Sequence, residues 1–315
     1  MLAVARPGRD PAPGQRDIFS MRIVSIGEVL WDVFEHSEQL GGAPFNFAVN
    51  ASRLGHEVIF VSAVGEDERG RAVLARARQA GLGAEFIQIV PGAPTGTVSV
   101  RVDSAGQPDF TIHRPAAYDA LDLDGAALER LQALEPDWLY YGSLHQADPR
   151  GRAQTRKLID RLAGARRFYD VNLRRNSYTP ELVLELMASA HVVKLNDEEA
   201  LTIESFSGRQ HEPLAEFTES WSRRLGWTAV AVTRGARGCG LRIGQDYAEP
   251  AGYVVTVADT VGAGDAFAAA LLHGLAQGWD ARRTGDFANR LGAVVAARPG
   301  ALPPWSMDDC WRLKN

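Results

Sequence analysis

Apolar residues occur along this chain in two alternating patterns. Short runs rich in valine, isoleucine and aromatic residues predict buried strands, and the segments between them repeat apolar residues at spacings of three and four, which predicts helices. Such alternation is typical of βαβ units around a largely parallel sheet, so the pattern indicates an α/β fold. The expected strands are 23–26, 58–64, 138–141, 167–171, 192–195 and 229–233. The expected helices are 44–54, 70–80, 150–162, 180–188, 214–225 and 264–277.

One region breaks this alternation. Residues 96–113 read as two strands with a period of two around a polar turn, which predicts an antiparallel hairpin. Together with the segment 32–41, the hairpin could form a small second sheet. We expect this sheet to act as a lid over the carboxyl ends of the main strands, because ligands bind there in open α/β folds.

A glycine-rich stretch near the C-terminus carries the clearest chemical signal. Residues 259–267, Asp-Thr-Val-Gly-Ala-Gly-Asp-Ala-Phe, follow an expected strand at Tyr253–Val257 and lead directly into a helix. Gly262, Ala263 and Gly264 therefore fall at a helix N-terminus, where unpaired N–H groups and the positive end of the helix dipole attract anions.

Asp265, in the first turn of that helix, has three interpretations. It could be an ordinary helix-start acid, or it could simply follow a tight glycine turn. It could instead be a general base that takes a proton from a hydroxyl while the neighbouring N–H groups stabilise transferring negative charge.

Other phosphate-binding and catalytic motifs do not fit the sequence. The dinucleotide-binding fingerprint needs a third glycine where Phe267 stands, and no lysine follows a glycine as a P-loop requires. The chain also lacks a Gly-x-Ser-x-Gly elbow and a His-Glu-x-x-His zinc motif.

Composition narrows the range of partners and compartments. The 315 residues are 45% hydrophobic and 23% charged, which is ordinary for a soluble α/β protein, and the length suits one large domain with an appendage or two domains. A net charge of −5 without a basic block argues against nucleic acid and anionic membrane partners. The two cysteines, Cys239 and Cys310, form neither a disulfide framework nor a metal spacing, so a cytoplasmic location is expected.

The ends of the chain and its apolar runs add two expectations. Residues 1–20 are polar and lack the apolar core of a signal peptide, so we expect a disordered extension, with the folded domain spanning 21–315. No run approaches the roughly 20 apolar residues of a membrane span.

Two long stretches resemble the signatures of one enzyme family. Residues 259–267 resemble the C-terminal signature of the ribokinase-like, or PfkB, carbohydrate kinases, and residues 41–55, Gly-Gly-Ala-Pro-Phe-Asn-Phe-Ala-Val-Asn-Ala-Ser-Arg-Leu-Gly, resemble the N-terminal signature. The resemblance covers essentially Met21 to the C-terminus. Within the family, the runs 27–34, 94–100 and 110–119 are most similar to bacterial fructokinases.

The resemblance implies a fold and a reaction. The fold is a ribokinase-like, mostly parallel central sheet flanked by helices, with a small β-sheet lid at about 32–42 and 94–116. The reaction is ATP-dependent phosphorylation of a primary sugar hydroxyl, with D-fructose to fructose 6-phosphate as the leading case. Asp265 is implied to be the catalytic base, and Gly262, Ala263 and Gly264 the anion hole. Phosphoryl transfer depends mainly on positioning and charge neutralisation, which suits this arrangement.

The resemblance also implies binding residues. Gly41 and Gly42 would be the hinge of the lid, Glu199 would act indirectly on Mg²⁺, and a loop of several family members implies a K⁺ site. The implied sugar-side residues are Asp32, Gly41, Gly42, Asn46, Asn172 and Arg174. The implied nucleotide-side residues are Asn196, Thr233, Gly235, Gly238 and Asn289. The implied K⁺ loop contains Asp259, Val261, Val295, Arg298 and Gly300.

Several alternatives stay open. Ribokinase, 2-keto-3-deoxygluconate kinase and nucleoside kinase activities belong to the same fold. A nucleoside would favour an aromatic lid, and Trp31, Phe34 and Phe45 leave this alternative open. A non-catalytic sugar-binding regulator is the alternative from another class. The exposed edge of the hairpin favours pairing between subunits, so a homodimer is one expectation.

Overall fold

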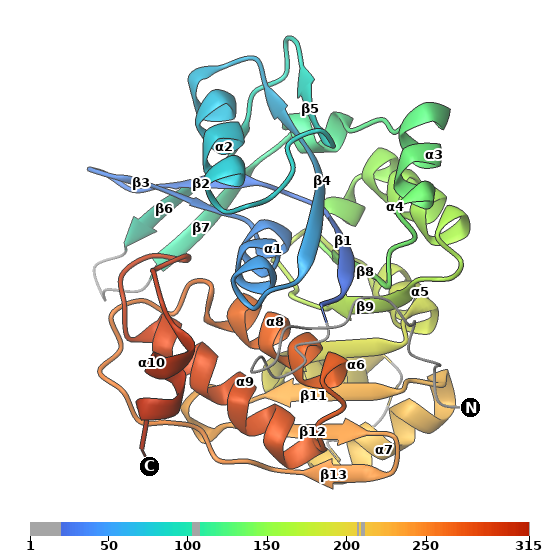
Figure 1. The fold of residues 1–315 in the computed structure, drawn as a ribbon, viewed down its shortest axis with the longest axis vertical. Helices are drawn as coiled ribbons and strands as arrows, with labels where there is room; N and C mark the ends of the chain where they lie inside the picture. The colour runs from blue at the N-terminus through green and yellow to red at the C-terminus, as the bar shows by residue number, and fades with distance from the viewer. Residues whose placement is uncertain (1–19, 103–107, 207, 209–211, 315) are drawn as a thin grey trace, which may run out of the picture.

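A nine-stranded, mostly parallel sheet forms the centre of the computed structural model, which describes residues 20–102, 108–206, 208 and 212–314 (Figure 1). Its strand order is β13-β12-β11-β10-β9-β8-β1-β4-β5, and only the pairings of β12 are antiparallel. The six predicted strands are confirmed: β1 (Arg22–Ile26), β4 (Glu57–Gly65), β8 (Trp138–Gly142), β9 (Arg166–Asp170), β10 (Val192–Asn196) and β11 (Ala229–Thr233). The edges add β5 (Ile87–Val90), β12 (Cys239–Ile243) and β13 (Asp246–Ala248).

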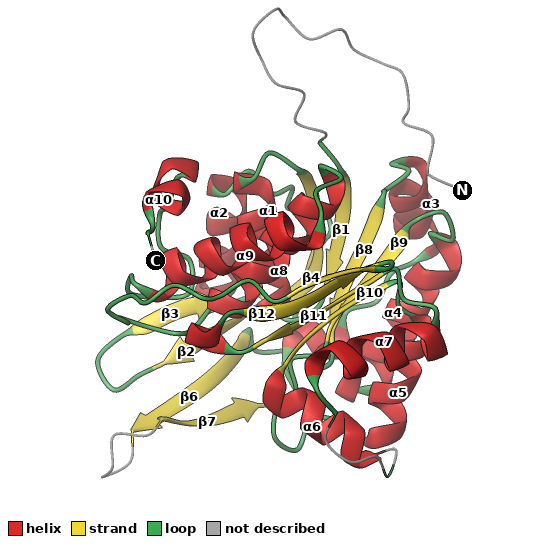
Figure 2. Cartoon of the chain, turned by 90° about the horizontal axis from the view of Figure 1, so that it is seen from below, coloured by secondary structure: helices red, strands yellow, loops and turns green. Residues whose placement is uncertain are grey.

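Helices cover both faces of this sheet (Figure 2). Successive residues of a strand point to opposite faces, so Phe60 packs with one helix layer and Val61 with the other. The first layer contains α1 (Ala43–Arg53), α2 (Glu68–Gln79), α8 (Ala263–Ala276), α9 (Ala281–Ala296) and α10 (Met307–Arg312). The second contains α3 (Gly125–Ala133), α4 (Pro149–Arg161), α5 (Pro180–Ser189), α6 (Asp197–Phe206) and α7 (Leu214–Leu225). The six predicted helices correspond to α1, α2, α4, α5, α7 and α8.

A separate four-stranded sheet confirms the predicted hairpin and its partner segment. Its order is β3-β2-β6-β7, with β2 (Leu30–Val33), β3 (Glu38–Gly41), β6 (Gly96–Val102) and β7 (Pro108–His113). The hairpin strands β6 and β7 are antiparallel, and β2 joins β6 in parallel. Leu30, Val98, Val100 and Leu144 form its own small core, which seats the sheet over the carboxyl ends of the main strands.

The predicted strand at Tyr253–Val257 is wrong. The chain there is irregular, and the side chains of Val254 and Val257 are 93% and 58% exposed. The apolar pattern suggested a strand, but β13 already ends at Ala248 and no backbone within the described ranges pairs with the segment. An apolar run without such a partner cannot form a ladder. Its apolar residues instead line a cavity described below.

Some predictions about compartment and termini lie beyond these observations. The expected extension 1–20 falls outside the described residues except for Ser20, whose hydroxyl donates to the Gly55 carbonyl. Cys239 and Cys310 are buried free thiols. Among the described helices, none has both the length and the apolar character that crossing a bilayer requires. The cytoplasmic location and the homodimer stay predictions.

A buried histidine pair generates the first testable prediction. The Met21 N–H donates to His56 Nδ1, so the His56 Nε2–H can donate to His273 Nδ1 at 3.2 Å. The pKa of both imidazoles is lowered to about 4, by burial and, for His56, also by the neighbouring His273. The unfolded chain, with ordinary pKa values near 6.5, takes up these protons first. The stability from this pair is therefore complete above about pH 6.5 and is lost as pH falls towards 4.

We expect the free energy of unfolding to fall between pH 7 and pH 5 by roughly 1–2 kcal/mol per histidine. Urea unfolding at both pH values measures it. The double variant His56→Leu/His273→Phe should show a weaker pH dependence, whereas the exposed His36→Asn should behave as the unaltered protein. An unchanged pH dependence in the double variant would contradict this account.

Candidate active site

Two cavities of about 340 Å³ each meet at the carboxyl edge of the main sheet. The first lies between this edge and the small sheet, with Val98, Phe110 and Ile112 as an apolar cover. The second lies beside α8 and α9 and includes the irregular segment 252–257. Both cavities share Thr233, Thr260 and Gly264. The start of α8 therefore stands where a molecule in one cavity would face a molecule in the other.

The start of α8 has the features of an anion site. Gly262 precedes the helix with φ of 80°, and a Cβ there would lie 2.2 Å from the Ala301 carbonyl oxygen, so only glycine fits. The Ala263 N–H donates to the Thr260 carbonyl, at 3.3 Å. Among the described residues, the N–H groups of Gly262 and Gly264 have no acceptor. Two free donors and the helix dipole are thus available to negative oxygens.

Asp265 stands in the first turn of α8 and lines the first cavity. Asn46 Nδ2 on α1 donates to its Oδ2 at 2.8 Å. Burial and the nearby Asp170 raise the pKa of Asp265 to about 6, against the lowering effects of Lys194, Asn46 and Arg174. Its carboxylate is thus held by a side chain of another helix. At neutral pH it is ionised, yet basic enough to accept a proton.

Sequence reasoning missed the charged pair beneath this helix. Asp170 at the end of β9 and Lys194 on β10 are register neighbours, and Lys194 Nζ donates to both carboxylate oxygens at 3.0 and 3.3 Å. The Tyr140 hydroxyl donates to Asp170 Oδ2 at 2.9 Å. Burial lowers the pKa of Lys194, but the surrounding carboxylates outweigh it and the pKa is raised. A lysine within the apolar run Val192–Leu195 was the available signal.

The ammonium of Lys194 also adjoins the anion site. A Cβ on Gly264 would lie 3.2 Å from Lys194 Nζ, which places the positive charge beside the helix start. Gly264 is therefore the point where the two cavities, the free N–H donors and the buried ammonium meet.

The predicted sugar-side residues lie together around the first cavity, except that Gly41 is placed beside it. Burial raises the pKa of Asp32 to about 6, with Arg174 acting in the opposite direction. A Cβ on Gly41 would lie 3.0 Å from Asp32 Oδ2. Gly42 has φ of 108°, and a Cβ there would lie 2.6 Å from the Glu28 carbonyl oxygen. The residues that line the cavity are Asp32, Gly42, Asn46, Asn172 and Arg174.

Asn196 and Glu199 form a reciprocal cap at the start of α6. The Asn196 N–H donates to Glu199 Oε2, and the Glu199 N–H donates to Asn196 Oδ1, both at 2.8 Å. The Leu173 N–H donates to Glu199 Oε1 at 2.7 Å. Both carboxylate oxygens of Glu199 thus accept hydrogen bonds from the backbone, and its indirect role towards a metal ion stays a prediction. Within the described residues, no group of three or more His, Cys, Asp or Glu could hold one. Asn196 lines the first cavity.

The other predicted nucleotide-side residues line the second cavity: Thr233, Gly235, Gly238 and Asn289. Gly238 has φ of 88°, and a Cβ there would lie 2.2 Å from the Pro250 carbonyl oxygen. Asn289 Nδ2 donates to the carbonyls of Pro250 and Ala251, each at 3.1 Å. These contacts fasten residues 250–251 to α9 and the 235–238 turn, and so shape the cavity wall.

Two residues of the predicted K⁺ loop, Val261 and Gly300, bind the Asp259 carboxylate. Its Oδ1 accepts from the Val261 N–H at 2.9 Å and its Oδ2 from the Gly300 N–H at 3.2 Å. The Arg298 N–H donates to the Val295 carbonyl at 3.0 Å, at the end of α9. One carboxylate thus joins the segment before α8 to the segment after α9.

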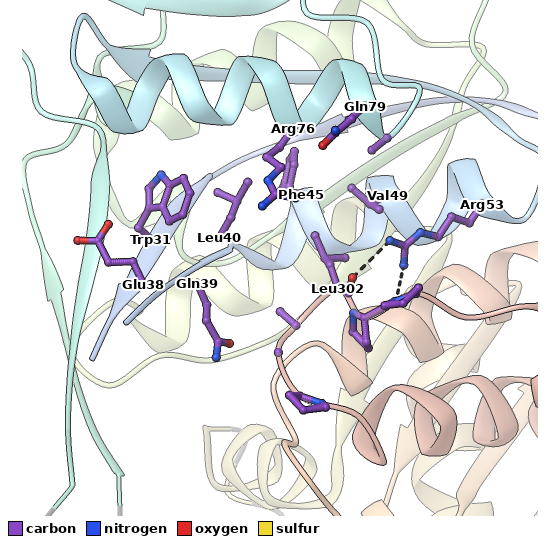
Figure 3. A pocket seen from close by; sticks show the side chains of 16 residues that line it. Trp31, Glu38, Gln39, Leu40, Phe45, Val49, Arg53, Arg76, Gln79 and Leu302 are labelled. Carbon is purple, nitrogen blue, oxygen red and sulfur yellow. Dashed lines mark hydrogen bonds between the residues drawn. The ribbon is translucent and has the colours of Figure 1, made fainter. Parts of the chain in front are cut away.

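A larger groove of about 700 Å³ lies elsewhere, between β3, α1, α2 and residues 299–304 (Figure 3). Trp31 and Phe45 line this groove, and neither residue lines the first cavity. Its acid, Glu38, is bound by Arg69. The groove therefore offers no uncommitted carboxylate, and its two aromatic rings do not form a stacking cover for a nucleoside in the first cavity.

Residues 18–307 match the model of the pfkB family carbohydrate kinases. The chain belongs to the PfkB family of carbohydrate kinases. A fructokinase of Vibrio alginolyticus is 30% identical to this kinase over 88% of the chain and 93% of its own length. A structure of Vibrio cholerae fructokinase with fructose, ADP and calcium ion bound is 26% identical, with a TM-score of 0.79 over 95% of this chain and all of that one. A 2-dehydro-3-deoxygluconokinase of Thermotoga maritima shares the fold at 20% identity, with a TM-score of 0.81 over 93% of this chain and 98% of that one.

The pKa of Asp265 leads to a prediction about pH. If Asp265 is the general base, it must be ionised, so kcat/KM should fall below about pH 6, by at least tenfold per pH unit at the acid end. Replacing Asn46 by Leu removes a donor that favours the carboxylate, so the same fall should begin at higher pH. Initial rates from pH 5 to 8 measure both. A rate that stays flat down to pH 5 would rule out Asp265 as the titrating base.

Proposed function

We propose that this kinase transfers the γ-phosphoryl group of ATP to a primary hydroxyl of a neutral sugar, and that the sugar is D-fructose. The observation that carries the proposal is the position of Asp265 in the first cavity, directly after Gly264, which lines both cavities, and beside free N–H donors. The fructokinases among its relatives support the choice of sugar. The first cavity would hold the sugar and the second the nucleotide.

The proposed chemistry follows from this geometry. Asp265 takes the proton of the sugar hydroxyl, whose oxygen then bonds to the γ-phosphorus as the bond to the β-phosphate oxygen breaks. Asn46 holds the base, while the N–H groups of Gly262 and Gly264 stabilise the transferring oxygens. Mg²⁺, bound mainly to phosphates and water, would neutralise charge, with Glu199 and Asn196 acting indirectly. A K⁺ ion would be held in the loop of Asp259.

The charges of the first cavity favour a neutral sugar over a sugar acid. Glu28, Asp32 and Asp265 line it, and Lys194 is already paired with Asp170. A substrate carboxylate would therefore face three acids with Arg174 as the uncommitted cation among the described lining residues. A silent regulator is disfavoured by the intact base and helix start.

The deciding experiment is an ADP-release assay with MgATP. It compares fructose, ribose, 2-keto-3-deoxygluconate, glucose, tagatose and adenosine, with and without K⁺. We expect kcat/KM for fructose to exceed that for each other compound by about tenfold or more, because the polar floor suits a ketose and neither Trp31 nor Phe45 lines the cavity. Added K⁺ should raise the rate relative to Na⁺.

Asp265→Asn is the matched control, because it retains shape and hydrogen bonding but cannot accept the proton. It should bind ATP and fructose normally and lose turnover by about 10²- to 10⁴-fold. A different preferred sugar would overturn the choice of fructose only. Turnover of none of these compounds by the unaltered protein would contradict the proposed function.

A further inference from the structure

Glu28 is a buried acid in the sugar cavity to which the chemistry above gives no task. It lies between β1 and β2, its exposed fraction is 4%, and it lines the cavity. Its Oε2 has no hydrogen-bond partner among the described residues. An unpaired buried carboxyl oxygen destabilises the protein, because no hydrogen bond replaces its lost hydration. We therefore expect this oxygen to accept a hydrogen bond in another state of the protein, such as the substrate-bound one.

Two cations act on Glu28, and one of them is already committed. Burial raises the pKa of Glu28 to about 7, Asp265 adds to this, and Arg174 and Arg114 lower it. Arg114 donates through Nε and Nη2 to the Asp119 carboxylate, and through Nη1 to the Leu144 carbonyl at 3.2 Å. Arg114 is therefore not available to Glu28.

Arg174 is available. It lines the same cavity, it is exposed, and in the described part of the chain its guanidinium makes no hydrogen bond or ion pair. It follows Asn172, whose φ of 39° turns the chain at the end of β9. Its charge lowers the pKa of Asp32 and Asp265 as well as that of Glu28. Three acids thus compete for one free guanidinium.

The neutral groups near Glu28 cannot replace this cation. The Tyr118 hydroxyl and both ring nitrogens of His145 are buried and also lack partners among the described residues. Burial raises the pKa of Tyr118 well above its usual value and lowers that of His145 to about 4, so both are uncharged at neutral pH. They leave the charge of Glu28 uncompensated.

We propose that Glu28 is a positioning residue for Arg174: with both substrates bound, its carboxylate pairs with the guanidinium and holds it across the cavity. The inference rests on the proposed function. A guanidinium has five N–H donors in a planar fork, so one edge can bind Glu28 while another faces the oxygens of the transferring phosphoryl group. The pairing also keeps Arg174 away from Asp265, whose basicity an ion pair would reduce.

A double-mutant cycle on turnover of fructose with MgATP tests the pairing. We expect Glu28→Gln and Arg174→Gln each to lower kcat by about tenfold or more, with little change in ATP binding. The double variant should be no slower than Arg174→Gln alone, because Glu28 acts through Arg174. Glu28→Asp, which retains the charge on a shorter side chain, should recover part of the rate.

Controls separate positioning from general damage. Tyr118→Phe removes the neighbouring unpaired hydroxyl without changing charge. Its effect on kcat should be independent of Arg174→Gln, so the fold-changes of the two single variants should multiply in the double variant. Circular dichroism and ATP binding establish that each variant is folded. If Glu28→Gln retains kcat within twofold, or its effect multiplies fully with Arg174→Gln, the pairing is wrong while the sugar kinase stands. An unaltered protein that phosphorylates no sugar would contradict both.

Discussion

The start of α8 at Gly262 is the constraint on which the rest of the site depends. The backbone can turn into the helix here only with a left-handed residue lacking a side chain, because the Ala301 carbonyl occupies the space of a Cβ. This close approach leaves N–H donors facing the junction of the cavities and places Asp265 in the first turn. In the proposed function, one turn of backbone thus positions both the anion-binding N–H groups and the base.

Buried charge supplies the second half of the account. The Asp170–Lys194 pair lies in adjacent parallel strands below α8, and Asp170 helps to raise the pKa of Asp265 while Lys194 opposes it. The acids Glu28 and Asp32 surround the same cavity from the lid side. An excess of buried carboxylates is stable only where cations or hydrogen bonds are nearby. In the proposed function, these acids would accept hydrogen bonds from the sugar hydroxyls, and the N–H groups at the start of α8 would bind the phosphoryl oxygens.

Much of the fold could be predicted from sequence because strand burial on two faces gives continuous apolar runs, as in 58–64 and 229–233. The lid hairpin was predictable from its period of two. Tyr253–Val257 was not, since an apolar run does not reveal whether a neighbouring strand exists to pair with it. The helix start, with Asp265 in its first turn, could be predicted from the glycine-rich spacing. The places of Glu28 and Lys194 in the site could not be predicted, because they depend on which strand ends lie side by side.

The resemblance to known signatures and the structure contribute differently to the site. The resemblance implies that Asp32, Asn46 and Asp265 are functional, and the structure places all three around one cavity. The structure adds two facts that residue identity does not give. The Glu199 carboxylate accepts hydrogen bonds from two backbone N–H groups, and the Arg174 guanidinium has no partner within the described chain.

The most direct test of the central claim is a crystal structure of this kinase with fructose and a non-hydrolysable ATP analogue. The account predicts the primary hydroxyl of the sugar within about 3 Å of the Asp265 carboxylate, with the γ-phosphate on the N–H groups of Gly262 and Gly264. A sugar in the groove of Trp31 and Phe45, or a γ-phosphate bound away from the start of α8, would contradict it.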